Sequence, residues 1–461
     1  HELQSSGVRD RYKSIAIMPR ATHLTPVLLV GLTSAFTVSA FTPTRPKHVL
    51  TQPLTTPTTL RQRHSPAPRL TATPTSLEAA ATPPSPGVGV TPSIINLAKN
   101  IVGSGVLALA AGIAAFSGSS LALLPAIVIL FFTGAVSAYT FSTIARVGAG
   151  VGANTYRDTW SKVFGEKTAF IPEATVVFMT ACAGLSYSII IGDTFASIAK
   201  LAGAPAVLAS SNAWILILSV FVLLPLALLR DLSSLAVGSV IGTSGTCYTA
   251  LFIFKRLLDK SYAAGGKFFG AIPKEVQPAF FAPTAAKPLI NSGMFVLLSM
   301  LSSAFLAHYN APKFYDELAP PEDGSSKLPR FNLVCAAAFG AAALLMGSIM
   351  AGGYLTFGAA SQGLILNNYA TSDPLAFLAR LGIGMSIIFS YPLNFVGLRG
   401  GVLGMLGLSS QADKRSVHVI TTVVLLCLMN GASLFLKDLG LVVGLGGAIL
   451  GSALVYILPA L

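Results

Sequence analysis

Ten long apolar segments run through most of this sequence, and they constrain its fold more than any other feature. A helix needs about 20 apolar residues to cross the roughly 30 Å of hydrocarbon in a membrane. Strands of a closed β-barrel are shorter and alternate with a period of two, which these segments do not. The sequence therefore predicts an all-α membrane protein with about ten transmembrane helices, at 92–116, 120–145, 169–197, 212–229, 232–256, 289–309, 331–357, 374–396, 416–436 and 438–460.

The composition agrees with this class. Only 10% of the 461 residues are charged and the mean hydropathy is +0.71, whereas about a quarter of the residues of a soluble domain are charged. The formal net charge of +13 is densest in residues 1–90, which hold nine Lys or Arg residues against three acidic ones. No module of basic and aromatic residues accompanies this charge, so we expect no nucleic-acid partner.

The four cysteines each lie within an apolar segment, at Cys182, Cys247, Cys335 and Cys427. None of them forms a CxxC pair, so the sequence predicts neither a disulfide framework nor a zinc site. We expect all four to be small core residues.

The N-terminal region has the features of a targeting presequence rather than of a folded domain. No methionine precedes Met18, so residues 1–17 are interpreted as upstream sequence or the edge of a fragment. A short basic start, an apolar run and the small residues Val38-Ser39-Ala40 outline a signal peptide over 18–40. Residues 41–90 are rich in Thr, Pro and Arg, which is typical of a disordered transit peptide. The membrane domain then spans 91–461.

A signal peptide joined to a transit peptide, with Phe41 directly after the cleavage site, resembles the bipartite presequences of algae with secondary plastids. This resemblance implies that the protein lies in a plastid membrane. The alternative interpretation is a disordered cytosolic tail that follows a misread start. In that case a vacuolar or other endomembrane location is expected.

Lys and Arg residues in the loops favour a mature N-terminus on the inner side of the membrane. With that orientation, eleven of them lie in inner loops, while the outer loops hold Lys200, Lys437 and a cluster of six in 255–287. Long loops are translocated largely regardless of their charge. Leaving out 255–287 makes the bias eleven against two, so we predict that the N-terminal side is inside.

The first span contains residues that an ordinary membrane helix avoids. Residues 101–116 alone reach only about 24 Å, so the helix must begin before Lys99. Gly103-Ser104-Gly105 then follows about one turn after this lysine. Glycine is costly in a helix interior and lysine is costly in hydrocarbon. Transporters use such breaks to offer free backbone groups to a substrate, although close packing of helices through small residues is the alternative.

The sixth span is interrupted too. Its sequence, LSMLSSAFLAHYNAPKFYDEL, holds paired serines, a histidine and Pro312. Proline at this position removes a helical hydrogen bond near residue 308. Two interrupted helices that stand five helices apart are what an inverted five-helix repeat predicts.

Four motifs in the matching spans carry a resemblance to a known family. NLAKNIVGSGVLAL in the first span, YSIIIGDTF in the third, AFLAHYNAPKFYDEL in the sixth and FSYPLNFVGLR in the eighth resemble the amino acid/auxin permease family of the amino acid–polyamine–organocation superfamily. That family includes sodium-coupled neutral amino acid transporters and plant vacuolar amino acid transporters. The resemblance covers 92–461 and implies the LeuT-type fold. Its members usually have eleven helices, so we expect that the last one is missing here.

The resemblance implies a secondary active transporter that holds an amino acid between the first and sixth spans. The substrate is expected to be neutral, and a single copy of the chain in the bilayer is expected to carry it. Its carboxylate would meet N–H groups of the first break and its ammonium group would meet carbonyls of the sixth span, while a tyrosine lines the cavity and a phenylalanine gates it. Cross-helix hydrogen bonding is the alternative role of the two serines. The expected substrate-binding residues are Gly103, Ser104, Gly105, Tyr187, Ser302, Ser303, Ala304 and Phe305.

At Lys99 the sequence departs from the sodium-coupled members of the family. The resemblance implies that those members carry an asparagine at this place, beside a sodium site. Ser386 and Ser390 are four residues apart and share one face of the eighth span. A lysine ammonium group near these two serines would take the place of the sodium ion. We therefore predict proton coupling or cation-independent exchange, with sodium symport as the alternative and no cofactor besides the coupling ion. The other role for Lys99 is to reach the membrane interface.

Three further polar residues lie in apolar segments. Asp193 in the third span is a candidate proton relay, or a carboxylate held by backbone near the interface. His308 titrates near neutrality as a free side chain and lies beside the second break, where a structural role is the alternative. Arg380 lies near an end of the eighth span, so we expect it to extend to the interface.

Two other classes of function compete with transport. An intramembrane enzyme would use His308 with Asp316 or Glu317, but the sequence has no HExxH or DxxxD motif and this reading leaves the paired breaks unexplained. A channel would need a filter segment or a ring of charged residues, and neither is present in the sequence. We therefore expect no enzyme.

Overall fold

The computed structural model describes residues 87–461 except for 230–235 and 282–290. The predicted upstream segment 1–17, the signal peptide 18–40 and nearly all of the transit-peptide segment 41–90 lie outside the described residues. The first described helix begins at Val90, which is close to the predicted start of the membrane domain at 91.

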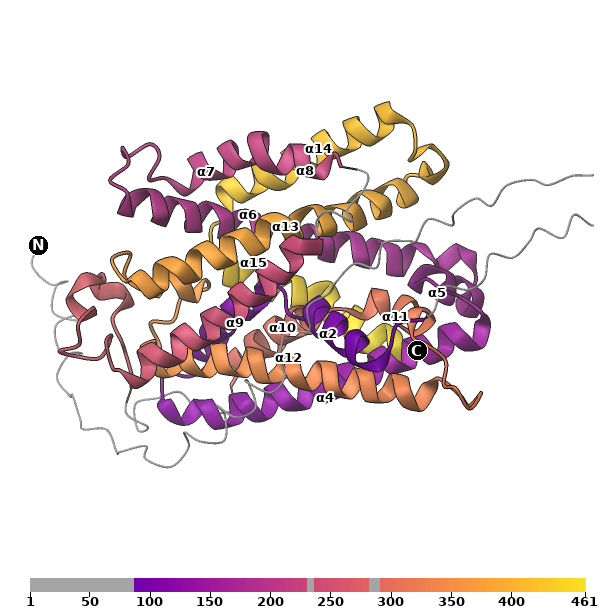
Figure 1. Ribbon diagram of the computed structural model, residues 1–461, viewed down its shortest axis with the longest axis horizontal. Coiled ribbons are helices and arrows are strands. Elements are labelled where there is room, and N and C mark those ends of the chain that lie inside the picture. The colour runs from indigo at the N-terminus through magenta and orange to yellow at the C-terminus, as the bar shows by residue number, and fades with distance from the viewer. Residues whose placement is uncertain (1–86, 230–235, 282–290) are drawn as a thin grey trace, which may run out of the picture. The chain divides into compact units, whose positions relative to one another are not determined.

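The described chain is a bundle of long helices (Figure 1), and the ten predicted segments each coincide with one of its helical elements. Seven helices are long and apolar enough to cross a membrane, and the bent first pair brings this number to eight among the described residues. The helices that coincide with the ten predicted segments are, in chain order, α2 (Val90–Ile101) with α3 (Leu109–Phe116), α4 (Leu123–Val151), α6 (Phe170–Leu201), α7 (Ser211–Leu218) with α8 (Leu224–Ala227), α9 (Ala236–Leu258), α10 (Gly293–Ala304) with α11 (Ala311–Glu317), α12 (Leu328–Phe357), α13 (Pro374–Met405), α14 (Arg415–Phe435), and α15 (Leu439–Gly446) continuing to α16 (Leu458–Ala460). We number these ten segments as spans in the same order.

Polar caps and prolines mark where several helices begin. The carboxylate of Asp373 accepts a hydrogen bond from the N–H of Leu375 at the start of α13, and Asp438 accepts one from Leu441 at the start of α15. Such caps satisfy N–H groups that the first helical turn leaves free. A short helix, α5 (Tyr156–Phe164), lies in the loop between α4 and α6 and begins at the capping hydroxyl of Thr155.

Helix α13 packs against both α6 and α9 (Figure 1), whereas α12 packs against α4, α2 and α9. Glycines bring α9 and α13 into close contact. A Cβ atom added at Gly245 would lie 2.7 Å from the carbonyl oxygen of Gly382, and one at Gly242 would lie 2.6 Å from Oγ of Ser386. Small residues let helices in membranes approach in this way. We call the end of the bundle where α2 begins the inner end, following the predicted orientation, and the opposite end the outer end.

The two broken spans are tied together at the inner end. The N–H of Val88 donates to the carbonyl of Glu317 over 2.7 Å, and the N–H of Ala319 donates to the carbonyl of Val88 over 2.9 Å. These bonds form a short parallel bridge between Val88 and Leu318. The segment before α2 and the segment after α11 are therefore held together by backbone hydrogen bonds.

A second set of bonds ties the bundle at the outer end. The hydroxyl of Tyr354 on α12 donates to the carbonyls of Ser117 and Ser119 over 2.8 and 2.9 Å. The amide of Asn291, just before α10, donates to the carbonyl of Phe116 over 2.7 Å. The outer halves of the first, sixth and seventh spans are thus joined.

The prediction that all four cysteines are core residues is wrong for one of them. Cys335 is buried and Cys182 and Cys247 are half-buried, but Cys427 is exposed. It lies on α14, which packs against the rest of the bundle along one side only. In a membrane, an apolar residue on the other side faces lipid at no cost, so apolar sequence alone does not predict burial.

Candidate substrate site

The first span is broken where the sequence places Gly103-Ser104-Gly105. Helix α2 ends at Ile101, Gly103 is extended with φ −102° and ψ −164°, and a 3₁₀ helix, η1 (Ser104–Ala108), leads into α3. The two helical parts meet at a bend of 51°. The first N–H groups of a helix have no partner within it, and no other hydrogen bond reaches the N–H of Ser104 or Gly105 among the described residues. The break thus presents free donors.

The sixth span is broken three residues after its paired serines. Helix α10 ends at Ala304, and Ala307 leaves the helical conformation with φ −144° before a 3₁₀ helix, η8 (His308–Asn310), and α11. Pro312 lies in the first turn of α11, where its missing N–H costs nothing. The last carbonyls of a helix have no intrahelical partner, so the end of α10 presents free acceptors.

The two breaks lie against each other. A Cβ atom added at Gly105 would lie 3.5 Å from Cα of Ala304 and 3.7 Å from its Cβ. On the inner side, the amide of Asn310 donates to Oδ1 of Asn100 over 3.3 Å. The structure thus brings the donor end of η1 beside the acceptor end of α10, as an amino acid zwitterion requires.

The hydroxyls of the paired serines point to other helices. Oγ of Ser303 donates to the carbonyl of Val443 on α15 over 2.8 Å. Oγ of Ser302 donates to the carbonyl of Leu298 over 2.9 Å and accepts from Oγ of Ser452 at 3.2 Å. These are cross-helix and intrahelical bonds. The backbone carbonyls at this helix end are therefore the groups left for a ligand.

Phe305 packs away from the first break. Its side chain is fully buried, and its ring stacks on Phe339 of α12 with centroids 6.2 Å apart. A Cβ atom added at Gly134 of α4 would lie 3.0 Å from Cζ of this ring. In this conformation the ring is thus part of the contact between α10, α4 and α12.

His308 is a fully buried residue of the second break. Its Nε2 lies 3.1 Å from the carbonyl of Ser137 and 3.0 Å from Oγ1 of Thr140, while Nδ1 has no partner. A carbonyl can only accept, so Nε2 carries a hydrogen in this arrangement. The ring also packs edge-on against Phe141 and Phe339.

Tyr187 on α6 lies near the second break. Its ring centroid is 6.1 Å from that of Tyr391 on α13, and it is close enough to Tyr309 to interact with it electrostatically. The hydroxyl of Tyr391 lies 3.3 Å from both Ser188 and Asn430. The motif FSYPLNFVGLR thus serves to fasten α13 to its neighbours.

Lys99 lies at the start of the last turn before the first break and is half-buried. Ser386 and Ser390 are half-buried on α13, where Ser386 packs against Gly242. No hydrogen bond joins Lys99 to either serine within the described part of the chain. Contact between these three residues therefore stays a prediction.

A cavity of about 820 Å³ lies at the outer end, above the breaks. Its walls come from α3, α6, α10, the loop before α13 and the start of α15, and they include Ala111, Asp193, Met300, Asn367 and Lys437. Oδ2 of Asp193 accepts a hydrogen bond from the amide of Asn367 over 2.9 Å. Ala111 follows Gly105 by six residues, or about 9 Å of helix.

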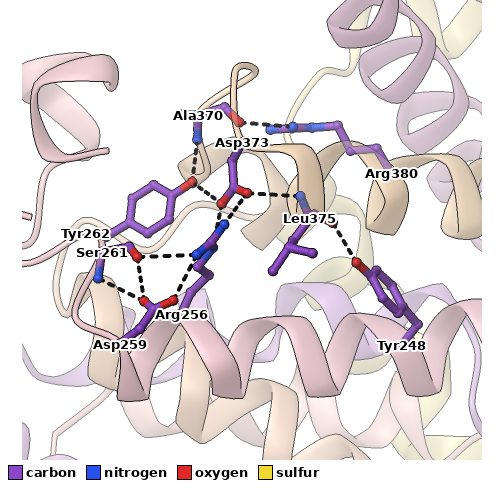
Figure 2. Close-up of polar contacts among 9 residues, drawn as sticks. All are labelled: Tyr248, Arg256, Asp259, Ser261, Tyr262, Ala370, Asp373, Leu375 and Arg380. Atoms are coloured by element: carbon purple, nitrogen blue, oxygen red, sulfur yellow. Dashed lines mark hydrogen bonds and ion pairs between the residues drawn. The ribbon is translucent and has the colours of Figure 1, made fainter. Parts of the chain in front are cut away.

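A buried ion pair joins the end of α9 to the start of α13 (Figure 2). Nη2 and Nε of Arg256 donate to the two carboxylate oxygens of Asp373 over 2.6 and 2.8 Å, and the hydroxyl of Tyr262 donates to the same carboxylate over 2.9 Å. Burial and the adjacent carboxylate of Asp373 raise the pKa of Tyr262, so its phenol keeps the hydrogen that it donates. Asp373 itself is fully buried.

The polar contacts around Arg256 also include the exposed Asp259 (Figure 2). Its carboxylate accepts bonds from Nη1 of Arg256 over 2.8 Å and from the N–H of Ser261 over 3.0 Å. Partial burial raises the pKa of Asp259, but the bonds from Ser261 and Arg256 outweigh it and hold that pKa below its ordinary value of 3.8.

The prediction that Arg380 reaches the membrane interface is wrong. Its side chain is 3% exposed and donates to the carbonyls of Leu366, Tyr369 and Ala370 over 2.9, 2.6 and 3.3 Å. Hydrophobicity and the position of Arg380 in the span do not show whether its side chain lies at the membrane interface or under a loop that folds back over the helix. Arg380 is a fixed part of that loop.

The candidates for an enzyme do not form a catalytic cluster. His308 bonds to α4, whereas Glu317 lies 3.9 Å from Lys313 in an exposed ion pair on α11. Within the described residues no three His, Cys, Asp or Glu side chains gather as metal ligands. Two asparagines that the sequence analysis did not select, Asn100 and Asn310, join the breaks instead. The only sequence signal for them was that each lies within one of the quoted motifs, close to its break.

Known proteins are similar to this chain in sequence. A model of the family described as transmembrane amino acid transporter protein matches residues 87–461. A Danio rerio protein named "Putative sodium-coupled neutral amino acid transporter 11" is 27% identical over 374 residues, covering 80% of this chain and 78% of its own. "Vacuolar amino acid transporter 5" of Schizosaccharomyces pombe is 26% identical over 377 residues, covering 80% of this chain and 82% of its own.

The fold resembles a solved transporter structure as well. MhsT, crystallised in complex with L-phenylalanine, superposes with a TM-score of 0.50 at 13% sequence identity, over 79% of this chain and 87% of that one. This likeness confirms the predicted LeuT-type fold. Because the family match covers most of the chain, the chain belongs to the transmembrane amino acid transporter protein family.

Proposed function

We propose that this chain is a secondary active transporter of neutral amino acids that holds its substrate between the two broken spans. The contact of Gly105 with Ala304 carries this proposal, because it places the free donors of η1 beside the free acceptors of α10. Two relatives are named as transporters of neutral amino acids or of amino acids. A single copy of the chain contains both breaks, so we propose a monomer as the working unit.

Each break recognises one end of a zwitterion. The carboxylate accepts hydrogen bonds from the N–H groups of Ser104 and Gly105, where the partial positive charge of the helix start adds to the attraction. The ammonium group donates to carbonyls of Ser302, Ser303 and Ala304. Since the described part of the site offers no ionised side chain at either break besides Lys99, a neutral side chain on the substrate is favoured.

Access to the site alternates between the two ends. The outer cavity is lined by Ala111, six residues after Gly105 on the first span, and by Gly444 of α15. At the inner end, α2 and α11 are tied through Val88, so they open and close together. Tyr187 lines the site from α6 and stays with the rest of the bundle.

For coupling we propose a proton or cation-independent exchange. The resemblance aligns Lys99 with the asparagine beside the sodium site of sodium-coupled members, so we propose that its ammonium group replaces the sodium ion, with Ser386 and Ser390 of α13 as its expected neighbours. His308, whose Nδ1 has no partner among the described residues, and Asp193, in the wall of the outer cavity, are the proton-accepting candidates. Sodium symport is the alternative, which the names of the relatives favour.

Uptake of labelled amino acids into proteoliposomes tests the function and the coupling together. A panel of neutral, acidic and basic amino acids is offered with a sodium gradient, a pH gradient or neither. We expect saturable uptake of neutral substrates, accelerated by counter-flow and by an inward proton gradient or by neither gradient. Uptake that needs sodium and ignores pH contradicts the role of Lys99, and no saturable uptake contradicts the function.

For location we propose a plastid membrane, on the strength of the presequence alone. A fusion of residues 18–90 to a fluorescent protein, expressed in an alga with a secondary plastid, is expected to give a plastid signal. A reticular or vacuolar signal contradicts this proposal. The matched control is a fusion that lacks residues 18–40, which is expected to stay in the cytosol.

A further inference from the structure

A groove of about 470 Å³ lies between α4 and α12 and shares no lining residue with the outer cavity. The two helices run side by side along the lower edge of the bundle in Figure 1. Several residues that line the groove are exposed, among them Ala135, Tyr139 and Ala336. The groove therefore opens on the lateral surface of the bundle, which faces lipid in a membrane. Its volume lies within the range of about 300–1,000 Å³ that is typical of small-molecule sites.

Small residues on both helices make room for the groove. Gly134 and Ala138 are four residues apart on α4, and Ala336 and Gly340 are four apart on α12, so each pair shares one helix face. Such residues usually let membrane helices approach closely. Here a Cβ atom added at Gly340 would meet nothing within 4 Å, so the protein itself does not fill the space in front of this glycine.

The floor of the groove is the wall against which the second break packs. Phe339 lines the groove and stacks on Phe305 with ring centroids 6.2 Å apart. The same ring meets His308 edge-on at 6.1 Å. A single aromatic ring thus separates an occupant of the groove from the second break.

A positive charge marks the inner end of the groove. Oγ of Ser142 on α4 donates to Oδ1 of Asn332 on α12 over 2.5 Å, and Arg146 lies one helical turn further toward the inner end. Arg146 is exposed and makes no ion pair or hydrogen bond with any described residue. Its charge is therefore available to an anionic ligand.

The groove is about as long as one leaflet of a membrane is deep. Arg146 lies five residues before the end of α4 at Val151, and from there its long side chain reaches the membrane interface. Gly134 lies twelve residues toward the outer end, which is about 18 Å of helix. Half of the roughly 30 Å of hydrocarbon is about 15 Å. A ligand with its head group at Arg146 would thus extend its apolar part to the middle of the membrane beside Gly134.

We propose that the groove binds one anionic phospholipid, with an acyl chain between α4 and α12 and the phosphate at Arg146. Basic pockets between membrane helices on the inner side bind anionic head groups, and a guanidinium binds a phosphate through two parallel hydrogen bonds. An acyl chain fits the apolar walls because it has no group that needs a hydrogen bond. A zwitterionic lipid has the same chains and phosphate, but its cationic group weakens the attraction to the arginine.

Native mass spectrometry of the purified protein tests this proposal without measuring transport, so its result is independent of the proposed function. Bound lipids are counted during titration with phosphatidylglycerol or with phosphatidylcholine of the same acyl chains. Thermal unfolding with each lipid added reports binding to the folded protein separately. We expect one phosphatidylglycerol per chain to be retained and to raise the unfolding temperature, at concentrations where phosphatidylcholine does neither.

Two variants remove the charge and the open space separately. Arg146→Gln keeps the groove and is expected to bind phosphatidylglycerol about fivefold more weakly, which corresponds to ~1 kcal/mol. Gly340→Leu fills the groove and is expected to retain no lipid. The matched controls lie on α14 and are expected to bind as the unchanged protein does. They are Arg415→Gln, which removes another exposed arginine, and Gly431→Leu, at a glycine whose Cβ meets nothing within 4 Å.

Equal retention of the two lipids overturns the proposal, and so does full affinity for phosphatidylglycerol in either Arg146→Gln or Gly340→Leu. An equal loss of affinity in Arg415→Gln overturns the assignment to Arg146. A sterol retained in place of phosphatidylglycerol, or a second copy of the chain that Gly340→Leu releases, would identify another occupant and overturn the proposal too. If Gly340→Leu does not fold, Ala336→Leu fills the groove one turn away at an exposed position.

Discussion

Gly105 and Ala304 face each other across the two breaks, and a Cβ atom on the glycine would lie 3.5 Å from Cα of the alanine. One residue begins the outer part of the first span and the other ends the outer part of the sixth. Their contact brings free backbone donors and acceptors together inside a membrane, where such groups are tolerated only against protein, water or a ligand.

Filling this contact is expected to stop transport without unfolding the protein. Gly105→Ala adds a methyl group at ordinary contact distance, so we expect folding and reduced uptake. Gly105→Leu adds bulk between the breaks, where overpacking costs about 1–3 kcal/mol, and we expect no uptake. Thermal unfolding and uptake are measured for each variant. Gly431→Leu on α14, whose Cβ meets nothing within 4 Å, is the control, and normal uptake by Gly105→Leu would contradict the site.

The hydroxyl of Ser303 is expected to serve structure and not substrate. Ser303→Ala loses the bond to the carbonyl of Val443, and hydrogen bonds between membrane helices average about 0.6 kcal/mol. We therefore expect a small loss of stability and an unchanged KM. A KM that rises tenfold while the unfolding temperature stays constant would show that the hydroxyl binds substrate.

The buried ion pair at the outer end is expected to matter far more than its exposed neighbour. Asp373→Asn leaves Arg256 buried without a full partner, which typically costs about 3–5 kcal/mol. Asp259→Asn removes an exposed partner of the same arginine, which costs at most about 1 kcal/mol. The two unfolding temperatures, compared in one detergent, decide this. Equal losses would contradict the assignment of Asp373 as the central acceptor.

Asp259 is not expected to be the source of any proton dependence. Its pKa lies below 3.8 in the folded protein, so its contribution to stability is present above the pKa of the unfolded chain and is lost only as the pH falls through the lower, folded pKa. Between pH 5 and 8 its charge is constant. The pH profile of uptake is therefore expected to be the same for Asp259→Asn and the unchanged protein, and a shifted profile would contradict this.

Helix α10 and the tenth span are expected to tolerate no side chain between them. A Cβ atom added at Gly447 would lie 1.6 Å from the carbonyl oxygen of Ser299, so the two backbones must separate to admit it. We expect Gly447→Ala to lower the unfolding temperature and uptake together. Gly444→Ala, three residues away and with open space around its Cβ, is the matched control and is expected to keep both.

The sequence predicted the spans and both breaks because these depend on local properties. Apolar length decides whether a helix crosses a membrane, and Gly103-Ser104-Gly105 and Pro312 act on the backbone where they stand. The charge of Arg380 was just as visible, yet its burial was not predicted. That burial depends on carbonyls of a loop that returns over the helix, which hydrophobic periodicity does not encode.

The directions of the side chains at the site could not be predicted either, because they too depend on how distant segments pack. Ser302, Ser303 and Phe305 were selected as ligands or gate from their positions in a motif. In the structure the side chains of Ser303 and Phe305 contact α15, α4 and α12, and Ala304 is the residue of this stretch that lies against the first break. Which face of an irregular helix points to a neighbour depends on where that neighbour packs.

A structure of the protein with a neutral amino acid bound tests the central claim most directly. We predict that the substrate lies between residues 103–105 and 302–304, with its carboxylate within hydrogen-bonding distance of the N–H groups of Ser104 and Gly105 and its ammonium group against the carbonyls at the end of α10. An amino acid bound elsewhere, with both breaks still packed against each other and no ligand between them, would contradict the account.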